Sequence, residues 1–427
     1  MEPKLKVVLI NHSFQVKYFY TRWQLFAHAH PNLDVTLLAP DECKWYNSKT
    51  YTYGNGGTTI KGKEVDEENF HIRLVRKKDL HGSDWYSPDF EREIKIIKPD
   101  ILYHIGGHTQ LSMIQLIHIA KKYCPKAKIL GFSMRGPHHN IKNRIVKGFS
   151  LAALRSRISY LYWLPRLKYV NKNVDAFFCH YPDALQAFRD EGFKKPIYIQ
   201  TQVGFNKDWF HPDDVARKEI RDKYNLGDAF VFGSATRFTW DKGLDDIIAA
   251  LPSEGNWKYL MMGSGNKNDQ ERLTQAIKDR HLEGKVILTG FVDWYEMTKY
   301  WNAIDCALHV PRSTYNWVET FSLSVVQAMA SGKPIIGSDS GSVPYQIGPV
   351  GSLIKEGDVK SLNEKMCWMM SHPEEAKAIG AKLMERTVNS FSIQHLNDLF
   401  YATMLDIQKE YMTRIKLIWQ IVTSNNL

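Results

Sequence analysis

Two cations stand five residues apart after an apolar run near the middle of the chain. Arg237 and Lys242 follow the strand-like residues 230–236, and Gly243 with a helix-like stretch comes next. A strand-to-helix loop of this kind brings cations and the first amides of a helix to the same edge of a sheet. Fixed positive charge there stabilises a departing diphosphate, because negative charge grows as the bond breaks. Arg237 and Lys242 are therefore candidates for a catalytic diphosphate clamp, the alternative being two ordinary cations on a solvated loop; the run at 319–334 described next favours the clamp.

A carboxylate and an amide stand eight residues apart in the run ETFSLSVVQAMASGKP, residues 319–334. Glu319 opens this run, and Thr320 or Ser322 could cap a helix that starts there. If so, Glu319 and Gln327 lie roughly 12 Å apart along the helix axis. One helix would then reach both ends of an extended ligand, while its first amides face the anionic groups in between.

These residues resemble the motifs of the large retaining glycosyltransferases of family 4. Arg237 and Lys242 match the family's Arg-x4-Lys pair, and Glu319 with Gln327 matches its Glu-x7-Glu signature with Gln as the second member. The resemblance implies the GT-B fold, an α/β architecture of two facing doubly wound Rossmann-like domains with a cleft between them. It also implies transfer of a sugar from a nucleoside-diphosphate sugar, UDP or GDP most of all, to an acceptor hydroxyl. Retention of anomeric configuration is implied as well, with no metal and no cofactor.

The resemblance assigns the donor site to the second half of the chain. It implies that Glu319 lies beside the donor sugar as a catalytic residue and that Gln327 holds the ribose. Because a neutral amide bonds less strongly than a carboxylate, we expect weaker donor affinity or an altered nucleotide preference. We expect the amides of Phe321, Ser322 and Leu323 to meet sugar or phosphate oxygens. The whole donor-binding set is Arg237, Lys242, Gly263, Val292, Phe321, Ser322, Leu323 and Gln327.

The acceptor side is less well defined. The family commonly places a His after the strand at 128–133, and here Arg135 or His138 could take that role. His104 and His108 flank a Gly-Gly pair, which breaks the helix that metal ligation at i and i+4 would need. We therefore expect satisfied or exposed histidines and no metal site, and we keep His108 as a third acceptor-side candidate.

The chain of 427 residues exceeds the size of a single hydrophobic core, so two domains are expected. Apolar strand-length runs alternate with helix-length segments, as in parallel sheets covered on both faces. We predict an acceptor-side domain at 1–205, a nucleotide-sugar-binding domain at 206–390, and a final helical segment at 391–427 that packs back on the first. The predicted strands are 6–11, 34–39, 101–105, 128–133, 175–180 and 197–201 in the first half, and 230–236, 258–263, 285–290, 305–310 and 333–338 in the second.

Composition points to a chain that works in a reducing cytosol. The five Cys are widely spaced, the first residues read as a strand rather than a signal peptide, and no window reaches ~18 uncharged apolar residues. The net charge is +10, and residues 101–174 contain 13 Lys and Arg but no Asp or Glu. The basic, aromatic segment 141–170 could lie on an anionic membrane surface or dock an anionic acceptor, such as a lipid-linked glycan or a polysaccharide precursor. With no nucleic-acid-binding signature, we expect no nucleic acid.

Two other functions fit the same residues. A nucleotide-sugar 2-epimerase of this fold would keep the Arg-Lys pair and the helix but would need no acceptor face. A non-catalytic nucleotide-sugar-binding protein would explain Gln327 in place of Glu.

Overall fold

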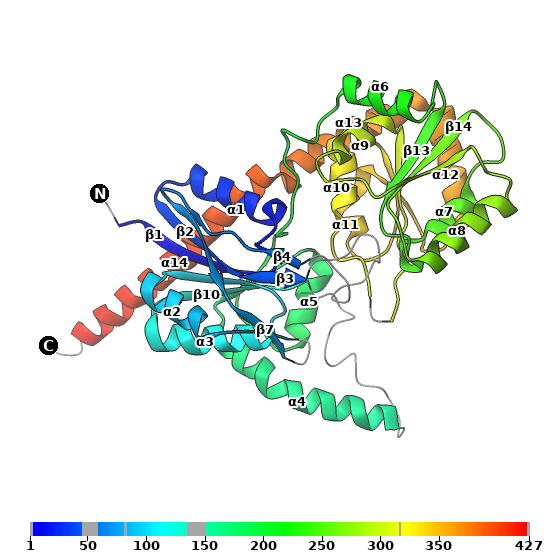
Figure 1. Cartoon of the computed structure of the whole chain (residues 1–427). Coiled ribbons are helices and arrows are strands. Elements are labelled where there is room, and N and C mark those ends of the chain that lie inside the picture. Colours follow the sequence, from blue (N-terminus) through cyan, green and yellow to red (C-terminus); the bar gives the residue numbers. More distant parts are fainter. Residues whose placement is uncertain (1–2, 45–58, 81–82, 135–150, 316, 425–427) are drawn as a thin grey trace.

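The computed structural model describes residues 3–44, 59–80, 83–134, 151–315 and 317–424, which form two α/β domains, each built on its own sheet (Figure 1). The first sheet has eight strands in the order β12-β11-β10-β9-β1-β2-β6-β5, and all are parallel except β5, which pairs antiparallel with β6. Its strands are β1 (Leu5–Ile10), β2 (Leu33–Pro40), β5 (Val65–Asp66), β6 (Phe70–Val75), β9 (Ile101–Ile105), β10 (Lys128–Phe132), β11 (Ala176–Cys179) and β12 (Ile197–Ile199).

The strands of the first sheet are apolar at successive positions because both faces are covered. Val8 and Ile10 of β1 pack into one buried cluster, whereas Val7 and Leu9 pack into another on the opposite face. The helices of this domain are α1 (Lys17–Ala29), α2 (Pro88–Ile97), α3 (Leu111–Tyr123), α4 (Leu151–Asn173) and α5 (Pro182–Asp190). Two antiparallel hairpins, which the sequence did not predict, pair β3 (Glu42–Lys44) with β4 (Thr59–Lys61) and β7 (Lys77–Leu80) with β8 (Ser83–Tyr86).

The second sheet has six parallel strands in the order β15-β14-β13-β16-β17-β18. The strands are β13 (Phe230–Ala235), β14 (Trp257–Met262), β15 (Val286–Gly290), β16 (Cys306–His309), β17 (Ile335–Ser338) and β18 (Ser352–Ile354). The helices around it are α6 (Asp214–Lys223), α7 (Leu244–Ala250), α8 (Lys267–Asp279), α9 (Met297–Ala303), α10 (Leu323–Ala330), α11 (Val343–Ile347), α12 (Val359–Ser371) and α13 (Pro373–Phe391). Two Rossmann-like parallel sheets are therefore present, which confirms the predicted α/β class.

The chain crosses between the sheets at two segments that lie side by side. Phe205 donates its amide to the carbonyl of Phe391 at 3.3 Å, and its own carbonyl accepts the amide of Ile393 at 2.9 Å. A Cβ at Gly204 would lie 2.6 Å from the Phe391 carbonyl, so the close approach requires glycine. After this crossing α14 (Ile393–Ser424) returns along the first domain (Figure 1), where Phe400 packs into the core.

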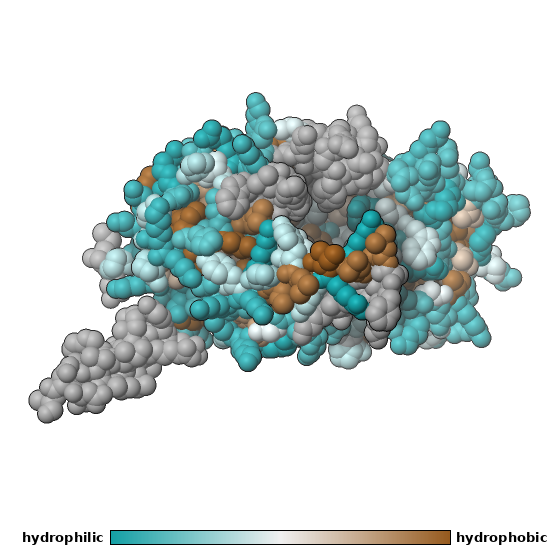
Figure 2. All heavy atoms as spheres, turned by 90° about the horizontal axis from the view of Figure 1, so that it is seen from below, coloured by the Kyte–Doolittle hydropathy of each residue, from teal (hydrophilic) through white to brown (hydrophobic). Residues whose placement is uncertain are grey.

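Helix α4 projects from the first domain (Figure 1) and has an apolar stripe on its surface. Leu151, Leu154, Ile158 and Leu161 are 65%, 54%, 58% and 63% exposed, and their spacing places them on one helix face. Figure 2, seen from the side on which α4 lies, shows apolar side chains next to hydrophilic ones on this face of the molecule. Within the described ranges, no helix is long and apolar enough to span a membrane.

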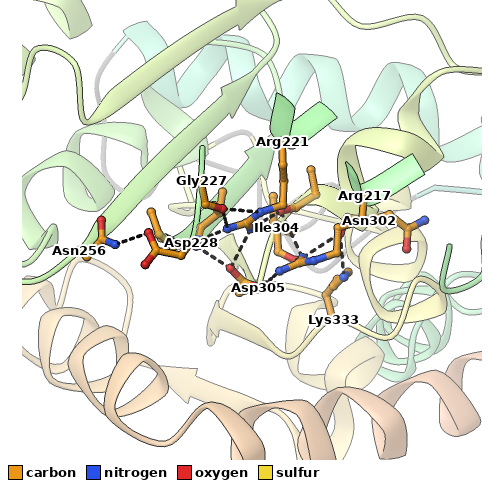
Figure 3. Close-up of polar contacts among 12 residues, drawn as sticks. Arg217, Arg221, Gly227, Asp228, Asn256, Asn302, Ile304, Asp305 and Lys333 are labelled. Atoms are coloured by element: carbon orange, nitrogen blue, oxygen red, sulfur yellow. Dashed lines mark hydrogen bonds and ion pairs between the residues drawn. The ribbon is translucent and has the colours of Figure 1, made fainter. Parts of the chain in front are cut away.

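Three cationic side chains bind the C-terminal end of α9 (Figure 3). They lie at the edge of the second sheet where the strands begin. Arg217 donates to the carbonyls of Asn302, Ala303 and Ile304 at 3.1–3.3 Å and to Asp305 at 2.6 Å. Arg221 also donates to the carbonyl of Ala303 and to Asp305.

Lys333 donates to the Asn302 carbonyl at 3.0 Å, and burial, together with the nearby guanidinium of Arg217, lowers its pKa to about 8. The last carbonyls of a helix have no partner within the helix, so these side chains supply the missing donors.

We expect Arg217→Met to lower the free energy of unfolding of the second domain by about 2–4 kcal/mol, because Asp305 and three carbonyls each lose one donor and the charge of Asp305 loses a partner. Thermal and urea unfolding measure this loss. Lys218→Met on the same helix is the control: its pair with Asp222 is exposed, so a change within about 0.5 kcal/mol is expected. Equal effects of the two substitutions would contradict the structural role of Arg217.

Candidate functional site

The predicted donor residues surround one cavity at the carboxyl edge of the second sheet. The cavity has a volume of about 330 Å³ and opens toward the first domain, whose His180 packs on one of its lining residues. The structure brings all nine of the residues predicted for donor binding or catalysis in this half to its wall. They are Arg237, Lys242, Gly263, Val292, Glu319, Phe321, Ser322, Leu323 and Gln327.

The two cations of the loop after β13 reach the cavity from different positions in the loop. Arg237 follows the strand within two residues, whereas Lys242 ends a short 3₁₀ turn and is followed by Gly243. Gly243 has φ +69°, and a Cβ there would lie 2.0 Å from the carbonyl oxygen of Val310. Only glycine fits this conformation and this contact, so it fixes the direction of Lys242.

Glu319 is a buried carboxylate that faces the Lys242 ammonium and the His309 ring. Its Oε2 lies 2.8 Å from the Lys242 ammonium and 3.5 Å from His309 Nε2, and its exposed fraction is 8%. Burial raises the pKa of Glu319, but the charge of Lys242 and the bond from His309 outweigh it, so the pKa lies well below its usual range. Glu319 therefore stays ionised, and Lys242 is held between it and the Trp317 ring, 4.0 Å from the ring centre.

Arg237 differs from Lys242 in having no partner. Its side chain is exposed, and no hydrogen bond or ion pair joins it to any residue in the described part of the chain. Because Lys242 and Glu319 neutralise one another, Arg237 provides the uncompensated positive charge at the cavity wall. An anionic ligand would gain most from this guanidinium.

Helix α10 begins at Leu323, four residues after Glu319, so the prediction of a helix that starts at the carboxylate is wrong. Ser322 is the N-cap: its hydroxyl accepts the amide of Val325 at 3.4 Å. Glu319 therefore lies in the preceding loop, outside the helix, and the axial distance expected from a continuous helix does not apply. Of the two cap candidates, Ser322 takes the role and Thr320 does not.

The loop before α10 is hydrogen-bonded to a buried glutamine. Gln346 accepts the Ser322 amide at 3.0 Å and donates to the Ser322 carbonyl at 2.8 Å. The amide of Ser322 is therefore already occupied, which corrects its predicted role as a donor to sugar or phosphate oxygens. The amides of Leu323 and Ser324, in the first turn of the helix, have no acceptor within the helix and face the cavity end.

Gln327 is almost fully buried in the second turn of α10. Its exposed fraction is 3%, and its Oε1 accepts a hydrogen bond from Trp301 Nε1 at 3.3 Å. The Tyr18 hydroxyl, from α1 of the first domain, interacts with the same amide. The Tyr18 ring packs against Trp294, another residue of the cavity wall, with 4.3 Å between the ring centres.

Two histidines that were not predicted from the sequence also lie at the site. His309 ends β16 and approaches Glu319, and His180 comes directly after β11. His180 stacks on Phe321 across the domain boundary, with 5.3 Å between ring centres, and bonds Thr201 Oγ1 through Nδ1 at 2.8 Å. Both stand where polar residues bind ligands in parallel sheets, so the strand-end rule applied to every predicted strand would have found them.

The acceptor-side candidates are not gathered in the described structure. His108 lies in the core of the first domain, 2.9 Å from Glu191, with both side chains at 2% exposure or less. This placement corrects its assignment to the acceptor side, because a histidine buried against Glu191 has no face open to a ligand. His104 bonds Ser112 at 2.8 Å, as expected for a satisfied histidine. Arg135 and His138 lie outside the described residues.

The absence of a metal site stays a prediction. Within the described ranges, no three His, Cys, Asp or Glu side chains gather in a way that could hold a metal ion.

Residues 216–385 match the family model described as Glycosyl transferases group 1. The matched residues lie in the second domain, from α6 into α13. Trehalose synthase of Pyrococcus horikoshii is 40% identical over 230 residues, which cover 47% of this chain and 53% of that protein. A GDP-mannose-dependent α-(1-6)-phosphatidylinositol monomannoside mannosyltransferase of Mycolicibacterium smegmatis is 26% identical over 185 residues, 42% of this chain and 48% of that protein. The match thus spans about half the length of these relatives.

Solved structures extend the likeness from residues 216–385 to both domains. Sucrose-phosphate synthase from Thermosynechococcus elongatus aligns with a TM-score of 0.66 at 16% identity, over 95% of this chain and 100% of that chain. HepE of Anabaena, solved with UDP and glucose, aligns with a TM-score of 0.63 at 15% identity, over 94% and 100%. The chain therefore has the GT-B fold, as predicted.

The stability of the protein should fall as the pH drops below about 6.5. Burial lowers the pKa of His180 to about 3, although the nearby charge of Glu319 acts in the opposite direction. Between these values the unfolded chain binds a proton at this position that the folded chain does not, so stability is lost by up to about 1.4 kcal/mol per pH unit.

Urea unfolding at pH 7, 6, 5 and 4 measures this loss. His180→Asn, which cannot titrate, should flatten the slope in this window. An unchanged slope in the variant would show that His180 is not the group responsible.

Proposed function

We propose that this protein is a retaining glycosyltransferase that moves a sugar from a nucleoside-diphosphate sugar to an acceptor hydroxyl. The observation that carries the proposal is the cavity at the front of α10. Arg237 and the first-turn amides of α10 face it with unbalanced positive charge, while Lys242 and Glu319 form a fixed, nearly neutral pair beside them. This arrangement suits a diphosphate at the helix tip with a sugar next to Glu319.

The transfer needs no protein nucleophile in this proposal. The bond between the anomeric carbon of the sugar and the diphosphate oxygen breaks, and the acceptor oxygen forms a new bond to that carbon on the same face. A phosphate oxygen of the leaving diphosphate takes the acceptor proton. The chain supplies Arg237 and Lys242 for the growing negative charge and the ionised Glu319 for the sugar. No described carboxylate other than Glu319 lines the cavity.

Separate observations bear on the identities of the donor and the acceptor. One relative is a GDP-mannose-dependent mannosyltransferase by name, and HepE was solved with UDP, so we propose UDP or GDP as the nucleotide. The apolar stripe of α4 is flanked by Arg155, Arg157 and Arg166, which fits an anionic membrane surface. We therefore propose a peripheral location on the cytoplasmic face and a lipid-linked or polysaccharide-precursor acceptor.

Arg237→Met should weaken the binding of UDP and GDP by about 10- to 100-fold, because a charge-assisted contact is lost without disturbing any contact within the described structure. Isothermal titration calorimetry with each nucleotide measures this change. Lys267→Met is the matched control, since that ammonium is 86% exposed on α8. Equal affinities of wild type and Arg237→Met would contradict a diphosphate site here.

Glu319→Ala should reduce sugar transfer by about 100-fold or more, since preorganised charge at a reaction centre is worth that much. The substrates are a panel of UDP-, GDP- and ADP-sugars with candidate acceptors, and product is followed by mass spectrometry. Incubating donor without acceptor separates the two rival functions: isomerised nucleotide-sugar would indicate a 2-epimerase, and unchanged donor in every assay would indicate a binding protein. Full transfer activity in the variant would refute the role of Glu319.

Membrane binding is tested by sedimentation with vesicles of 30% phosphatidylserine and with neutral vesicles. We expect binding to the anionic vesicles that falls with salt and is lost in Ile158→Glu, because the substitution places a charge in the apolar stripe. Val215→Glu, at an exposed apolar position on α6, is the control. Vesicle binding by Ile158→Glu equal to wild type would contradict a role of α4.

A further inference from the structure

The second domain has another cavity, at the edge of its sheet where the strands begin. Its volume is about 750 Å³. Arg217 and Arg221 of α6, Asp305 directly before β16, and Lys333 directly before Pro334 and β17 line it together (Figure 3). The cavity of the proposed function lies at the other end of the same strands, so a ligand bound here would be separate from the sugar donor.

The end of α9 does not need Lys333 as a donor. The Asn302 carbonyl, which accepts the Lys333 ammonium at 3.0 Å, already accepts Arg217 Nη1 at 3.1 Å. Among the described residues, the ammonium has no other hydrogen-bond acceptor and no carboxylate in an ion pair. Two of its three N–H donors are therefore unused, although burial and the two guanidinium groups oppose its charge. A structural role does not account for a third cation at this place.

The two arginines differ in what they leave for a ligand. Arg221 makes five hydrogen bonds with its five N–H groups, so its guanidinium contributes charge and no free donor. Arg217 bonds through Nη1 and once through Nη2, and its Nε–H has no acceptor in the described part of the chain. Arg217 and Lys333 bond the same carbonyl oxygen, so their unused donors are neighbours.

The charge around these donors is positive. Asp305 is the carboxylate among the three cations, and both of its oxygens are occupied. Oδ1 accepts Arg217 at 2.6 Å, and Oδ2 accepts Arg221 at 3.3 Å and the Val231 amide at 2.7 Å. The three cations therefore exceed this carboxylate by two charges. A doubly charged oxyanion would balance them, and a guanidinium beside an ammonium suits a phosphate group.

The rest of the cavity suits hydroxyl groups. Its volume lies within the range of about 300–1,000 Å³ typical of small-molecule sites, so it holds more than one oxyanion. Asp214, Asp228 and Glu374 line it as exposed carboxylates, and Asp228 lies beyond Arg221 from Lys333 (Figure 3). Carboxylates accept hydrogen bonds from hydroxyls and repel further anionic groups, so a ligand with one anionic end and an uncharged polar remainder fits best.

We propose that this cavity binds a small phosphate monoester with a hydroxyl-bearing remainder, such as a sugar phosphate, and that Lys333 and Arg217 bind its phosphate. This site is additional to the donor cavity, and it does not depend on the proposed function.

Calorimetry on the full chain tests the site with inorganic phosphate, glucose 6-phosphate and glucose as probes. We expect glucose 6-phosphate to bind at least about 5-fold more tightly than inorganic phosphate, because the carboxylates bind its hydroxyls. Lys333→Met should weaken its binding by about 10-fold or more, since a charge-assisted contact is lost. The control is Lys360→Met, whose ammonium is 88% exposed on α12 and which should bind as the wild type does.

The pH dependence separates direct contact from a structural effect. Lys333 has a pKa of about 8, and the charged groups around it, Arg217, Arg221, Asp305 and Asp214, are of types that do not titrate near this pH. The affinity for glucose 6-phosphate should therefore fall by up to about 10-fold per pH unit above pH 8, because binding requires the proton that the free ammonium loses. Lys333→Arg keeps its charge and should lose this slope.

Proton uptake tests the same point without a variant. Titrations of the wild type at pH 8 in two buffers of different ionisation enthalpy should show uptake of about half a proton on binding. Thermal unfolding verifies that Lys333→Met is folded, and we expect it to be at least as stable as the wild type, because a cation beside two others is removed.

Three results would overturn the inference. Equal affinities for inorganic phosphate and glucose 6-phosphate would indicate an adventitious ion only. Binding that is weakened by Arg237→Met and unchanged by Lys333→Met would place the phosphate in the donor cavity. Binding without proton uptake at pH 8 would show that Lys333 does not contact the phosphate.

Discussion

The buried ion pair between Lys242 and Glu319 is the contact on which the cavity depends. Two charged side chains of about 10% exposure are held 2.8 Å apart, where removal of either partner would leave the other charge without compensation. The pair joins the loop after β13 to the loop before α10, although 77 residues separate them in the chain. The opposite charges of Lys242 and Glu319 compensate one another. The net positive charge that an anionic ligand meets at the cavity wall therefore comes from Arg237.

The rest of the site follows from how the loop before α10 is supported. Gln346 occupies both backbone groups of Ser322, and Ser342 donates its amide to the Glu319 carbonyl at 2.8 Å. Gly341 fits beside that carbonyl because a Cβ would lie 2.1 Å from it. The loop is therefore fixed from the protein side, so its free donors and its carboxylate are directed to the cavity before any ligand arrives.

The sequence predicts the parts of the fold that repeat a simple pattern. Each apolar run that was predicted to be a strand is a strand. Strands of a parallel sheet that is buried on both faces are apolar at successive positions, so they stand out in the sequence. The antiparallel pairs β3–β4 and β7–β8 were missed, since short polar strands give no such signal.

The candidate site was also predicted where it follows the sheet pattern and missed where it depends on packing. All nine donor-side residues meet at the cavity because strand ends of one sheet share an edge. The helix start was misplaced because a Glu before Ser322 looks like a first turn, and only the cap geometry shows that it is not. The burial of His108 beside Glu191 depends on packing between segments about 80 residues apart, which spacing does not reveal.

The most direct test of the central claim is a crystal structure of the protein with bound UDP or GDP. The diphosphate should lie at the tip of α10, within hydrogen-bond distance of Arg237 and of the amides of Leu323 and Ser324, with the Lys242–Glu319 pair beside it. A nucleotide bound elsewhere, for instance in the cavity beside Lys333 at the opposite edge of the sheet, with the tip of α10 unoccupied, would contradict the account.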